Sequence, residues 1–554
     1  MKRQLLTLLI LLAVQLVIAQ RTVGLLSYEP SKSFDGYNLL YPHNQPNVYL
    51  LDNCGEIVHV WEDDASFRPG NTAYILPDGR LVKTKRPAAV AGNPIWAGGG
   101  GGIVEIRDWD NNLLWSFELN DSLHRLHHDI QPMPNGNILM IAWESHTIEE
   151  LLDAGMDTST LINGKLWSDM VIEVDPELDS IVWEWHAWDH LIQDFDSTKA
   201  NYGDVAAHPE LIDLNYDAEN SNPSWTHTNA IDYDPINDLI LLSVPTFSEA
   251  WILDHSTTTA EAASHSGGFS GRGGDLMYRW GNPATYRAGT ADDKKLFFQH
   301  DIQWLDDFVD ANHPFYGKVA AFNNRIGPDY SGGIVFTPPF DMYSFSFPMN
   351  GNVWGPEQAD WSFVYPGDST EMYSTGLSSI QLLPNGNYLF CSGRQGYSFE
   401  VTPGNEIVWE YVTPLKGGNP VEQGTTLNLN ENLTFRIKRY PTDYTAFVGK
   451  DLQPQGWIEL NPDSSYCDSV LPVDELFEEY GLKIFPTPAN DLLMVEWEAG
   501  KFVEMEIFDL LGRKKLQTMK LSGGRKYLNT SDWQPGFYFV RINGKASAKF
   551  LVNH

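Results

Sequence analysis

The sequence predicts an all-β protein: a six-bladed β-propeller followed by a small C-terminal β-sandwich. Three observations lead to this prediction. A sequence pattern of an alternating strand followed by a turn recurs between residues 21 and 470. Aromatic residues and turn formers are abundant, and the composition changes near residue 480. The chain holds 19 Trp, 24 Tyr and 27 Phe together with 46 Gly and 33 Pro. Bulky flat side chains separated by turn formers suit short strands joined by tight turns.

The composition also excludes several classes of protein. With 37 basic and 73 acidic side chains among 554 residues, the net charge is -36, while 42% of the residues are hydrophobic. A chain this apolar folds, and its length predicts one large domain with appendages. A nucleic-acid partner is excluded, because phosphates would be repelled and no Lys/Arg-rich run offers a local exception.

The N-terminal segment predicts export. Met1-Lys2-Arg3 precedes an apolar run over residues 5–18, and Ala19 offers a cleavage site, so residues 1–19 are predicted to be a signal peptide. A membrane anchor needs about 20 apolar residues, and no stable membrane span is predicted. The three cysteines form no CxxC motif, which disfavours a disulfide scaffold and a structural zinc site. Cys391 follows an apolar run and is expected to be buried.

Two sequence patterns alternate along residues 20–470, which we assign to the propeller. The first, an alternating run that ends in a Pro/Asn/Asp/Gly turn, occurs at 71–81, 128–138, 229–239 and 378–388, and starts again at 300–306. The second is centred on tryptophan and occurs at 57–62, 113–116, 181–184, 277–280 and 407–410. Such irregularly spaced hairpins predict propeller blades. An atypical last blade at 433–447, pairing with the N-terminal strand, brings the count to six.

Aligning the turns predicts which side chains meet. The inner strand of each blade lines the channel, and one position of that strand is shared by Asn71, His128, Asn229, His300 and Ser378. Because side chains alternate along a strand, His227 faces the same way as Asn229. Three histidines and one asparagine are therefore expected at one channel mouth. The same alternation predicts that His127, Asp129 and Asp301 face away.

This histidine ring allows more than one interpretation. A single histidine in a polar channel often only hydrogen-bonds a neighbour, but three in one register at a concave mouth favour ligand binding. Three imidazoles also suit zinc, although no carboxylate is expected to support them, so no metal and no cofactor are predicted. The run at 98–102 lacks a phosphate-binding frame and is expected to be a flexible loop. No HExxH or GxSxG motif is present.

Several segments resemble the PAPS-independent aryl-sulfate sulfotransferases. They are LHHDIQ at 126–131, WTHTNA at 225–230, YRWGNP at 278–283, FQHDIQ at 298–303, AFNN at 321–324 and FEVTPGNEIVW at 399–409. The resemblance implies a six-bladed propeller, a histidine that is sulfated during turnover, and sulfuryl transfer from one phenol to another. It places His300 on the nucleophile, His128 and His227 on the histidines that hold the sulfuryl group, and Asn229 beside them.

One departure from the family concerns an arginine. The family carries it on the strand after the His-x-Asn motif, and residues 241–248 contain none. A sulfate ester approaching an acidic chain needs a local cation. Arg394, Arg325, Arg279 and Arg439 could take its place, and the first two join Asn229, Ser378 and Asn71 as the predicted substrate-binding residues.

The predicted function is sulfuryl transfer from an aryl sulfate ester to a phenolic acceptor through a sulfohistidine, without PAPS. His300 would attack sulfur, and His128 or His227 would serve as the base. The alternative is a non-catalytic exported propeller that binds a carbohydrate, a peptide or a surface ligand. Ser378 in place of a fourth histidine and the missing arginine leave that alternative open. A sulfatase is disfavoured because the Cys/Ser-x-Pro-x-Arg signature is absent.

The C-terminal part is predicted to be a separate module. An acidic linker at 471–480 precedes short alternating runs in 481–554. These runs resemble the C-terminal sorting domain of the type IX secretion system, whose machinery is then the expected partner. The protein would cross the periplasm and become secreted or attached to the cell surface. An ordinary sandwich module with a binding role is the alternative.

Overall fold

The computed structural model describes residues 22–88, 93–161, 164–216, 223–464, 467, 482–498, 500–501, 503–509, 513–542 and 545–553. The chain divides into two compact units, Met1–Pro462 and Asp463–His554. The predicted signal peptide at 1–19 and the predicted linker at 471–480 lie outside the described residues. Within the described part of the chain, no helix is both long and apolar enough to cross a membrane.

The described residues of the first unit form six antiparallel sheets of four or five strands. The first sheet holds β5 (Phe67–Ile75), β6 (Leu81–Pro87), β7 (Ile103–Arg107) and β8 (Leu113–Glu118). The second holds β9 (His124–Pro132), β10 (Ile138–His146), β11 (Leu166–Asp175) and β12 (Ser180–His186). The third holds β15 (Ala230–Asp234), β16 (Leu239–Val244), β17 (Glu249–Asp254) and β18 (Tyr278–Trp280). The fourth sheet holds β19 (His300–Trp304), β20 (Val319–Asn323), β21 (Gly332–Phe336) and β24 (Trp361–Val364).

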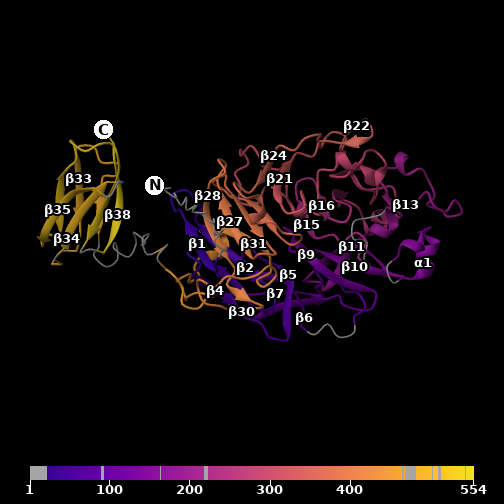
Figure 1. Cartoon of the computed structure of the whole chain (residues 1–554), viewed down its shortest axis with the longest axis horizontal. Coiled ribbons are helices and arrows are strands. Elements are labelled where there is room, and N and C mark those ends of the chain that lie inside the picture. The colour runs from indigo at the N-terminus through magenta and orange to yellow at the C-terminus, as the bar shows by residue number, and fades with distance from the viewer. Residues whose placement is uncertain are drawn as a thin grey trace, which may run out of the picture. The chain divides into compact units, whose positions relative to one another are not determined.

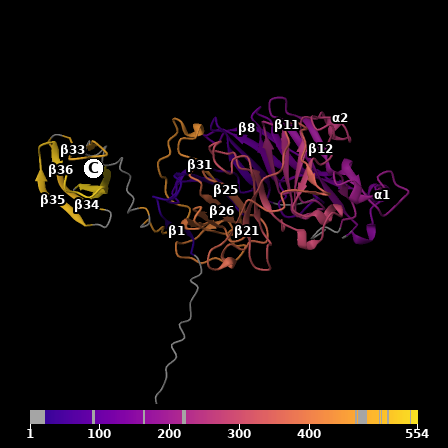
Figure 2. The ribbon, with the colours of Figure 1, turned by 90° about the horizontal axis from the view of Figure 1, so that it is seen from above.

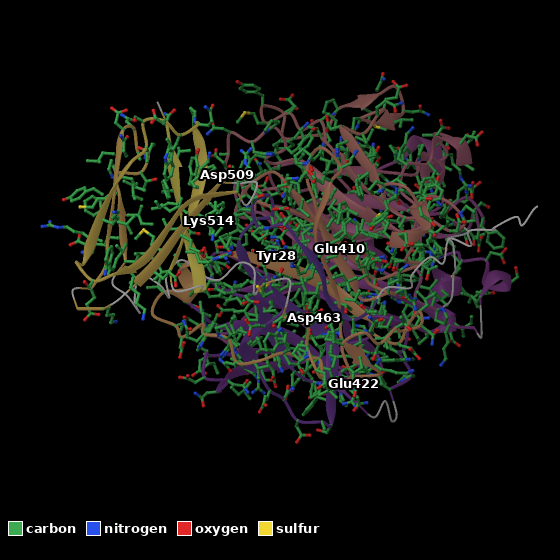
Figure 3. All side chains as sticks on the ribbon, turned by 60° about the vertical axis from the view of Figure 1, so that its left-hand side comes forward. Tyr28, Glu410, Glu422, Asp463, Asp509 and Lys514 are labelled. Atoms are coloured by element: carbon green, nitrogen blue, oxygen red, sulfur yellow. The ribbon has the colours of Figure 1, made fainter. Side chains whose placement is uncertain are left out.

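The last two sheets join the two ends of the unit. The fifth holds β25 (Ser379–Leu382), β26 (Tyr388–Ser392), β27 (Tyr397–Val401), β28 (Ile407–Val412) and β1 (Gly24–Tyr28); the sixth holds β31 (Thr434–Pro441), β2 (Gly36–Pro42), β3 (Val48–Leu51) and β4 (Ile57–Trp61). Figures 1 and 2 show β1 from the start of the chain beside the late strands, and Figure 3 labels Tyr28 and Glu410 on β1 and β28. The predicted pairing of 433–447 with an N-terminal strand is confirmed by the β31–β2 ladder.

The inner strands close into a ring. β5, β9, β15, β19, β25 and β31 contact one another in this order, and β31 contacts β5 again. A central cavity of about 30 Å³ is lined by residues from all six of these strands. The predicted all-β propeller is therefore confirmed.

The tryptophan patterns form the fourth strand outward from the channel in five sheets, namely β4, β8, β12, β18 and β28; in the fifth sheet β1 pairs beyond β28. Trp61, Trp183, Trp280 and Trp409 are buried, and the first three belong to apolar clusters that join neighbouring sheets. Cys391 on β26 is a free, buried thiol, as predicted, and burial raises its pKa to about 12. The tryptophan pattern therefore marks packing between sheets.

Short elements decorate the connections. Two helices, α1 (Ile148–Asp153) and α2 (Thr259–Ala262), begin with capping boxes at Thr147 and Thr258. Three two-stranded ladders pair β13 (Leu191–Ile192) with β14 (Ile212–Asp213), β22 (Met349–Asn350) with β23 (Val353–Trp354), and β29 (Leu415–Lys416) with β30 (Asn419–Pro420).

The second unit is a two-sheet structure, as predicted. One sheet contains β32 (Lys483–Phe485), β33 (Leu492–Glu496) and β36 (Arg525–Asn529); the other contains β34 (Val503–Asp509), β35 (Lys514–Leu521), β37 (Gly536–Ile542) and β38 (Lys545–Val552). One apolar cluster, including Val495, Ile507 and Val540, packs between the sheets. Asp509 and Lys514, at the ends of β34 and β35, are labelled in Figure 3.

Bulges in the inner strands position the central side chains. The ladder register shifts opposite residues 70–72 of β5, within 127–129 of β9 and just after His300 in β19. His128 has φ +49° and Asp301 has φ +53°. A bulge of this kind breaks the two-residue alternation and re-aims side chains. The expectation that Asp129 and Asp301 face away is therefore wrong: both bind Arg436 in the channel, and Asp301 lines the central cavity.

Candidate active site

Three imidazoles, carried on or just before three inner strands, lie close together. His128 belongs to β9, His300 starts β19, and His227 lies three residues before β15. The ring centres of His128 and His227 are 4.7 Å apart. Phe435 on β31 is 6.2 Å from both His128 and His300, and Phe298 is 6.4 Å from His227 and 6.2 Å from His300. The two phenyl rings and the three imidazoles thus form one continuous cluster.

Burial keeps these imidazoles neutral. His128 and His300 are 2% and 3% exposed, and His227 is half-buried. Burial lowers the pKa of His300 to about 3 and that of His227 to about 4. Burial, with the other histidines adding to its effect, also lowers the pKa of His128 well below its usual value. Each ring therefore has one nitrogen lone pair available at neutral pH.

Asn324 determines which nitrogen of His300 carries the proton. The Asn324 side-chain amide donates from Nδ2 to the carbonyls of Ser374 and Leu377, at 2.9 and 3.1 Å. Its Oδ1 atom must then face Nδ1 of His300, 2.8 Å away. Since Oδ1 only accepts, Nδ1 of His300 is the N–H. Its Nε2 atom consequently carries the lone pair that a nucleophile needs.

A second chain of contacts leads from His128 to a buried carboxylate. Nδ1 of His128 lies 2.8 Å from Nδ1 of His127, and Nε2 of His127 lies 3.2 Å from Oδ1 of Asp169 on β11. His127 stacks on Trp143, with ring centres 4.0 Å apart. Although burial alone would raise the pKa of Asp169, His127 and the Thr228 amide hold it below its usual value. Asp169 is therefore an ionised acceptor behind His127.

This chain sets the tautomer of His128. A carboxylate accepts, so Nε2 of His127 carries a hydrogen and its Nδ1 is the acceptor for the Nδ1–H of His128. Nε2 of His128 is then left with a lone pair. Strand alternation predicts that His127 faces away from the channel and assigns it no role, but its contacts with His128 and Asp169 place it directly behind the His128 ring.

The arginines separate into two groups. Arg279 and Arg439 form fully buried ion pairs with Glu249 and Glu400, so they cannot replace the missing family arginine. A Cβ built on Gly376 would lie 3.6 Å from both Nη2 of Arg394 and Cε1 of His300. This guanidinium and this imidazole therefore face the same point.

Arg394 and Arg325 both remain near the histidines. The guanidinium of Arg325 lies 3.6 Å from the centre of the Phe298 ring, and it contributes to the lowered pKa of His227 and His300. Arg394 donates to Asn430, and no carboxylate within the described ranges is at ion-pair distance from it. Arg394 therefore offers a cation that is not committed to a structural salt bridge.

The other predicted substrate-binding residues have internal partners. Asn229 donates to the carbonyl of Gln299, at 2.8 Å, and thereby ties β15 to the residue that precedes His300. Asn71 donates to the Gly99 carbonyl at 2.8 Å, and the Ser378 hydroxyl accepts from the Gly393 amide at 3.0 Å. These three side chains hold the backbone around the site.

The glycine run covers His128 closely. The Gly99 carbonyl accepts from the His128 amide at 2.8 Å, and a Cβ on Gly99, whose φ is +87°, would lie 2.0 Å from Nε2 of His128. Only glycine fits there. The run 98–102, expected to be a flexible loop, thus contributes Gly99 to the wall of the site.

A charged layer lies directly next to the imidazoles. Arg436, beside Phe435 on β31, binds Asp129 at 2.7 Å and Asp301 at 2.6 Å, and the Tyr74 hydroxyl donates to Asp129 at 2.8 Å. Each aspartate directly follows a site histidine, so this buried group locks β9 and β19 to β31. Removing one member would leave a buried charge unpaired, which typically costs about 3–5 kcal/mol.

Several residues around the site carry no signal in the sequence. Asn324 lies in the AFNN segment, which by itself indicates no role for it, and no local pattern marks Asp169 or His43. His43 follows β2; burial, together with the nearby cations of Arg86 and Arg394, lowers its pKa to about 4. Among the described residues, the one set of three metal-ligating side chains whose ligand atoms lie within 4.8 Å of one another is found elsewhere. The zinc interpretation of the histidine ring is thus not favoured.

The comparisons with known proteins agree with the resemblance. The profile of the arylsulfotransferase (ASST) family matches residues 27–334, more than half of the chain, so the chain belongs to that family. The matched range contains the three site histidines, Asn324 and Arg325, while Arg394 lies outside it. A secretion-system C-terminal sorting domain profile matches residues 483–553. The protein is therefore exported and is secreted or located at the cell surface.

Solved structures share only remote similarity. A protein of unknown function from Bacteroides caccae is 9% identical, with 68% of this chain and 93% of that chain covered and a TM-score of 0.37. An inactive virginiamycin B lyase variant from Staphylococcus aureus is 11% identical, with 71% and 89% covered and a TM-score of 0.31. The Dos1 propeller is 8% identical, with 96% of both chains covered and a TM-score of 0.28. No curated protein sequence matches the chain.

Proposed function

We propose that this member of the arylsulfotransferase family transfers a sulfuryl group from an aryl sulfate ester to a phenol through a sulfated His300, without PAPS. The observation that carries the proposal is the cluster of three neutral imidazoles, in which Asn324 holds Nδ1–H of His300 and leaves Nε2 free to attack. The glycine run, which in a nucleotide enzyme could cradle phosphates, packs instead against His128.

In the first step, Nε2 of His300 attacks the sulfur of the aryl sulfate. The N–S bond forms, the S–O bond to the aryl group breaks, and the electron pair leaves with the phenolate. The sulfated ring becomes cationic, and its Nδ1–H continues to donate to Asn324. Arg394 and Arg325 would attract the sulfuryl oxygens. His227, whose Nδ1 lies 2.8 Å from the Ser224 hydroxyl, would donate from Nε2.

In the second step, the acceptor phenol loses its proton to Nε2 of His128. The phenoxide oxygen attacks sulfur, the N–S bond breaks, and His300 returns to its neutral form. The proton on His128 then passes to the first phenolate, so the net reaction exchanges one phenol for another. We assign the base to His128 because the contact through His127 leads to ionised Asp169, a support that stabilises the imidazolium.

The substrate itself brings the base into range. In the free protein, burial and then the neighbouring histidines hold the pKa of His128 well below its usual value, which is low for a base at neutral pH. An anion about 4 Å away, at an effective dielectric constant of about 20, stabilises an imidazolium by about 4 kcal/mol. That equals about 3 pKa units, so a bound sulfuryl group moves a histidine pKa towards neutrality.

The proposal is tested with 4-nitrophenyl sulfate as donor and phenol as acceptor. We expect 4-nitrophenol release and phenyl sulfate formation with the wild type and loss of both with His300→Ala. His124→Ala is the matched control, because His124 lies on the same strand as His128 but is paired with Asp121 at the surface. If no aryl sulfate is turned over, or if His300→Ala is as active as the wild type, the enzyme proposal fails and an exported binding propeller takes its place.

A further inference from the structure

Two histidines and one aspartate gather away from the imidazole cluster. His190 ends the 3₁₀ helix η2 (Ala187–His190) after β12, His265 follows α2, and Asp275 precedes β18. Nδ1 of His190 lies 2.8 Å and Nδ1 of His265 2.7 Å from the same oxygen of Asp275. Their ligand atoms all lie within 4.8 Å of one another. Nothing in the proposed sulfuryl transfer uses these residues.

The hydrogen-bond partners of His190 indicate a missing positive charge. Nε2 of this buried ring lies 2.8 Å from the Ala262 carbonyl, which only accepts, so Nε2 carries a hydrogen. In the neutral ring, Nδ1 then presents a lone pair to a carboxylate oxygen 2.8 Å away. Two acceptors at that distance repel each other unless a proton or a metal cation lies between them. The pattern of a ring N–H on a backbone carbonyl and the opposite nitrogen on the cation is common for metal-bound histidine.

The surroundings allow an ion to reach this cluster. His190 is fully buried, and its ring lies parallel to the Trp185 ring, whereas the His265 side chain is 62% exposed. His265 also lines a surface cavity of about 400 Å³ together with Trp188, Tyr202 and His208. One ligand is therefore rigid and one is accessible, which leaves a coordination position open towards the cavity.

We propose that His190, His265 and Asp275 bind a divalent transition-metal ion of the zinc class. Two imidazole nitrogens and one carboxylate oxygen suit zinc and its neighbours, and a site with a single carboxylate is poor for calcium or magnesium. The ion would fasten the loop between α2 and β18 to η2. This departs from the sequence-based expectation of no metal, and it is independent of the sulfuryl-transfer proposal.

The test uses the exported full-length protein after chelation and dialysis. We expect Co²⁺ to produce visible d–d absorption that saturates at one equivalent, and Zn²⁺ to displace it, while Ca²⁺ and Mg²⁺ do not. His265→Ala and Asp275→Asn should each weaken Zn²⁺ binding at least about 10-fold, the lower range for loss of a supporting residue at a metal site. His208→Ala, in the same cavity but outside the cluster, should bind Zn²⁺ as the wild type does.

Two further readouts separate metal binding from folding. Zn²⁺ should raise the melting temperature of the wild type and of His208→Ala, but not that of Asp275→Asn. His265 is exposed, so His265→Ala is expected to fold even if Asp275→Asn does not. A wild type that shows no Co²⁺ absorption would overturn the proposal and leave a protonated His190 paired with Asp275. Binding that survives in His265→Ala would place the ion elsewhere and would equally overturn it.

Discussion

Exchanging Asp169 for asparagine should reverse the chain of polar contacts behind His128. The Thr228 amide donates to Oδ2 of Asp169 at 2.6 Å, so the oxygen of an asparagine must take that place. Its NH₂ group would then face Nε2 of His127, which lies 3.2 Å from the present Oδ1. His127 would have to accept there and donate from Nδ1, and His128 would carry its hydrogen on Nε2 and lose its function as a base.

The expected effect is confined to the second step. General-base assistance contributes about 10²–10⁴ in rate, so turnover with an unactivated phenol should fall about 100-fold or more. The attack by His300 needs no proton removal, so a rapid burst of 4-nitrophenol, close to one equivalent, should remain. Stopped-flow absorbance resolves the burst from the steady state, and acidic phenols should partly restore turnover because they need less help to ionise.

The matched control is Asp121→Asn, just before β9. Oδ1 of Asp121 accepts from the Leu123 and His124 amides, which an asparagine oxygen can also do, and its side chain is 57% exposed, so this exchange should leave turnover unchanged. If Asp169→Asn folds and turns over within about threefold of the wild type, the chain through His127 has no catalytic role. Loss of the burst itself would place Asp169 in the first step and refute the assignment.

Three further predictions concern pH, the glycine wall and the anion. Burial lowers the pKa of His300 to about 3, below the unfolded value of about 6.5, so kcat/KM should stay level as the pH falls from about 8 to about 5; a half-loss near 6.5 would contradict this. The same shift means that the unfolded chain binds more protons below pH about 6.5, so the free energy of unfolding measured with urea should fall as the pH drops towards about 3. Gly99→Ala should displace His128 and lower kcat at least about 10-fold. Gly98→Ala is the control and should leave kcat unchanged, because a Cβ at that position meets nothing within 4 Å. Equal kcat values for the two variants would show that the contact between Gly99 and His128 is unimportant. Arg394→Ala should raise KM for the sulfate ester about 10-fold or more and leave KM for the phenol unchanged. Steady-state kinetics with each substrate varied in turn measures both constants. If neither KM changes, Arg394 does not bind the sulfate ester.

Much of the fold follows from local sequence patterns. Turn-forming residues at 71–81, 128–138 and 378–388 mark the hairpins of three sheets, and the tryptophan pattern marks the fourth strand of each of these sheets. Both are local patterns of two-residue alternation and turn formers, so they survive without tertiary information. The closing β31–β2 pair was also predictable, because a propeller has to complete its ring.

The site was only partly predictable because its geometry depends on broken alternation. The shared register brought His128 and His300 to one mouth, but the bulges beside them sent Asp129 and Asp301 to Arg436 rather than away from the channel. No sequence rule predicts a positive φ at a histidine. Contacts between separate segments were equally inaccessible: Asn324 contacts His300 from the end of the neighbouring strand β20.

The sequence also could not identify which arginine binds the substrate. All four candidate arginines carry the same charge, and only the buried ion pairs with Glu249 and Glu400 exclude Arg279 and Arg439. A cation that serves packing and a cation that serves a ligand differ in their partners, which are set by tertiary contacts.

The central claim is that His300 carries the sulfuryl group between the two phenols. The most direct measurement is to mix the protein with a stoichiometric aryl sulfate without acceptor, quench at alkaline pH, and locate by peptide mass spectrometry the added mass of one SO₃ group. We predict that the group is found on the peptide containing His300, that it disappears when phenol is added before the quench, and that it is absent from His300→Ala. Modification of another residue, or turnover with no labelled protein at any time in a single-turnover experiment, would contradict the account.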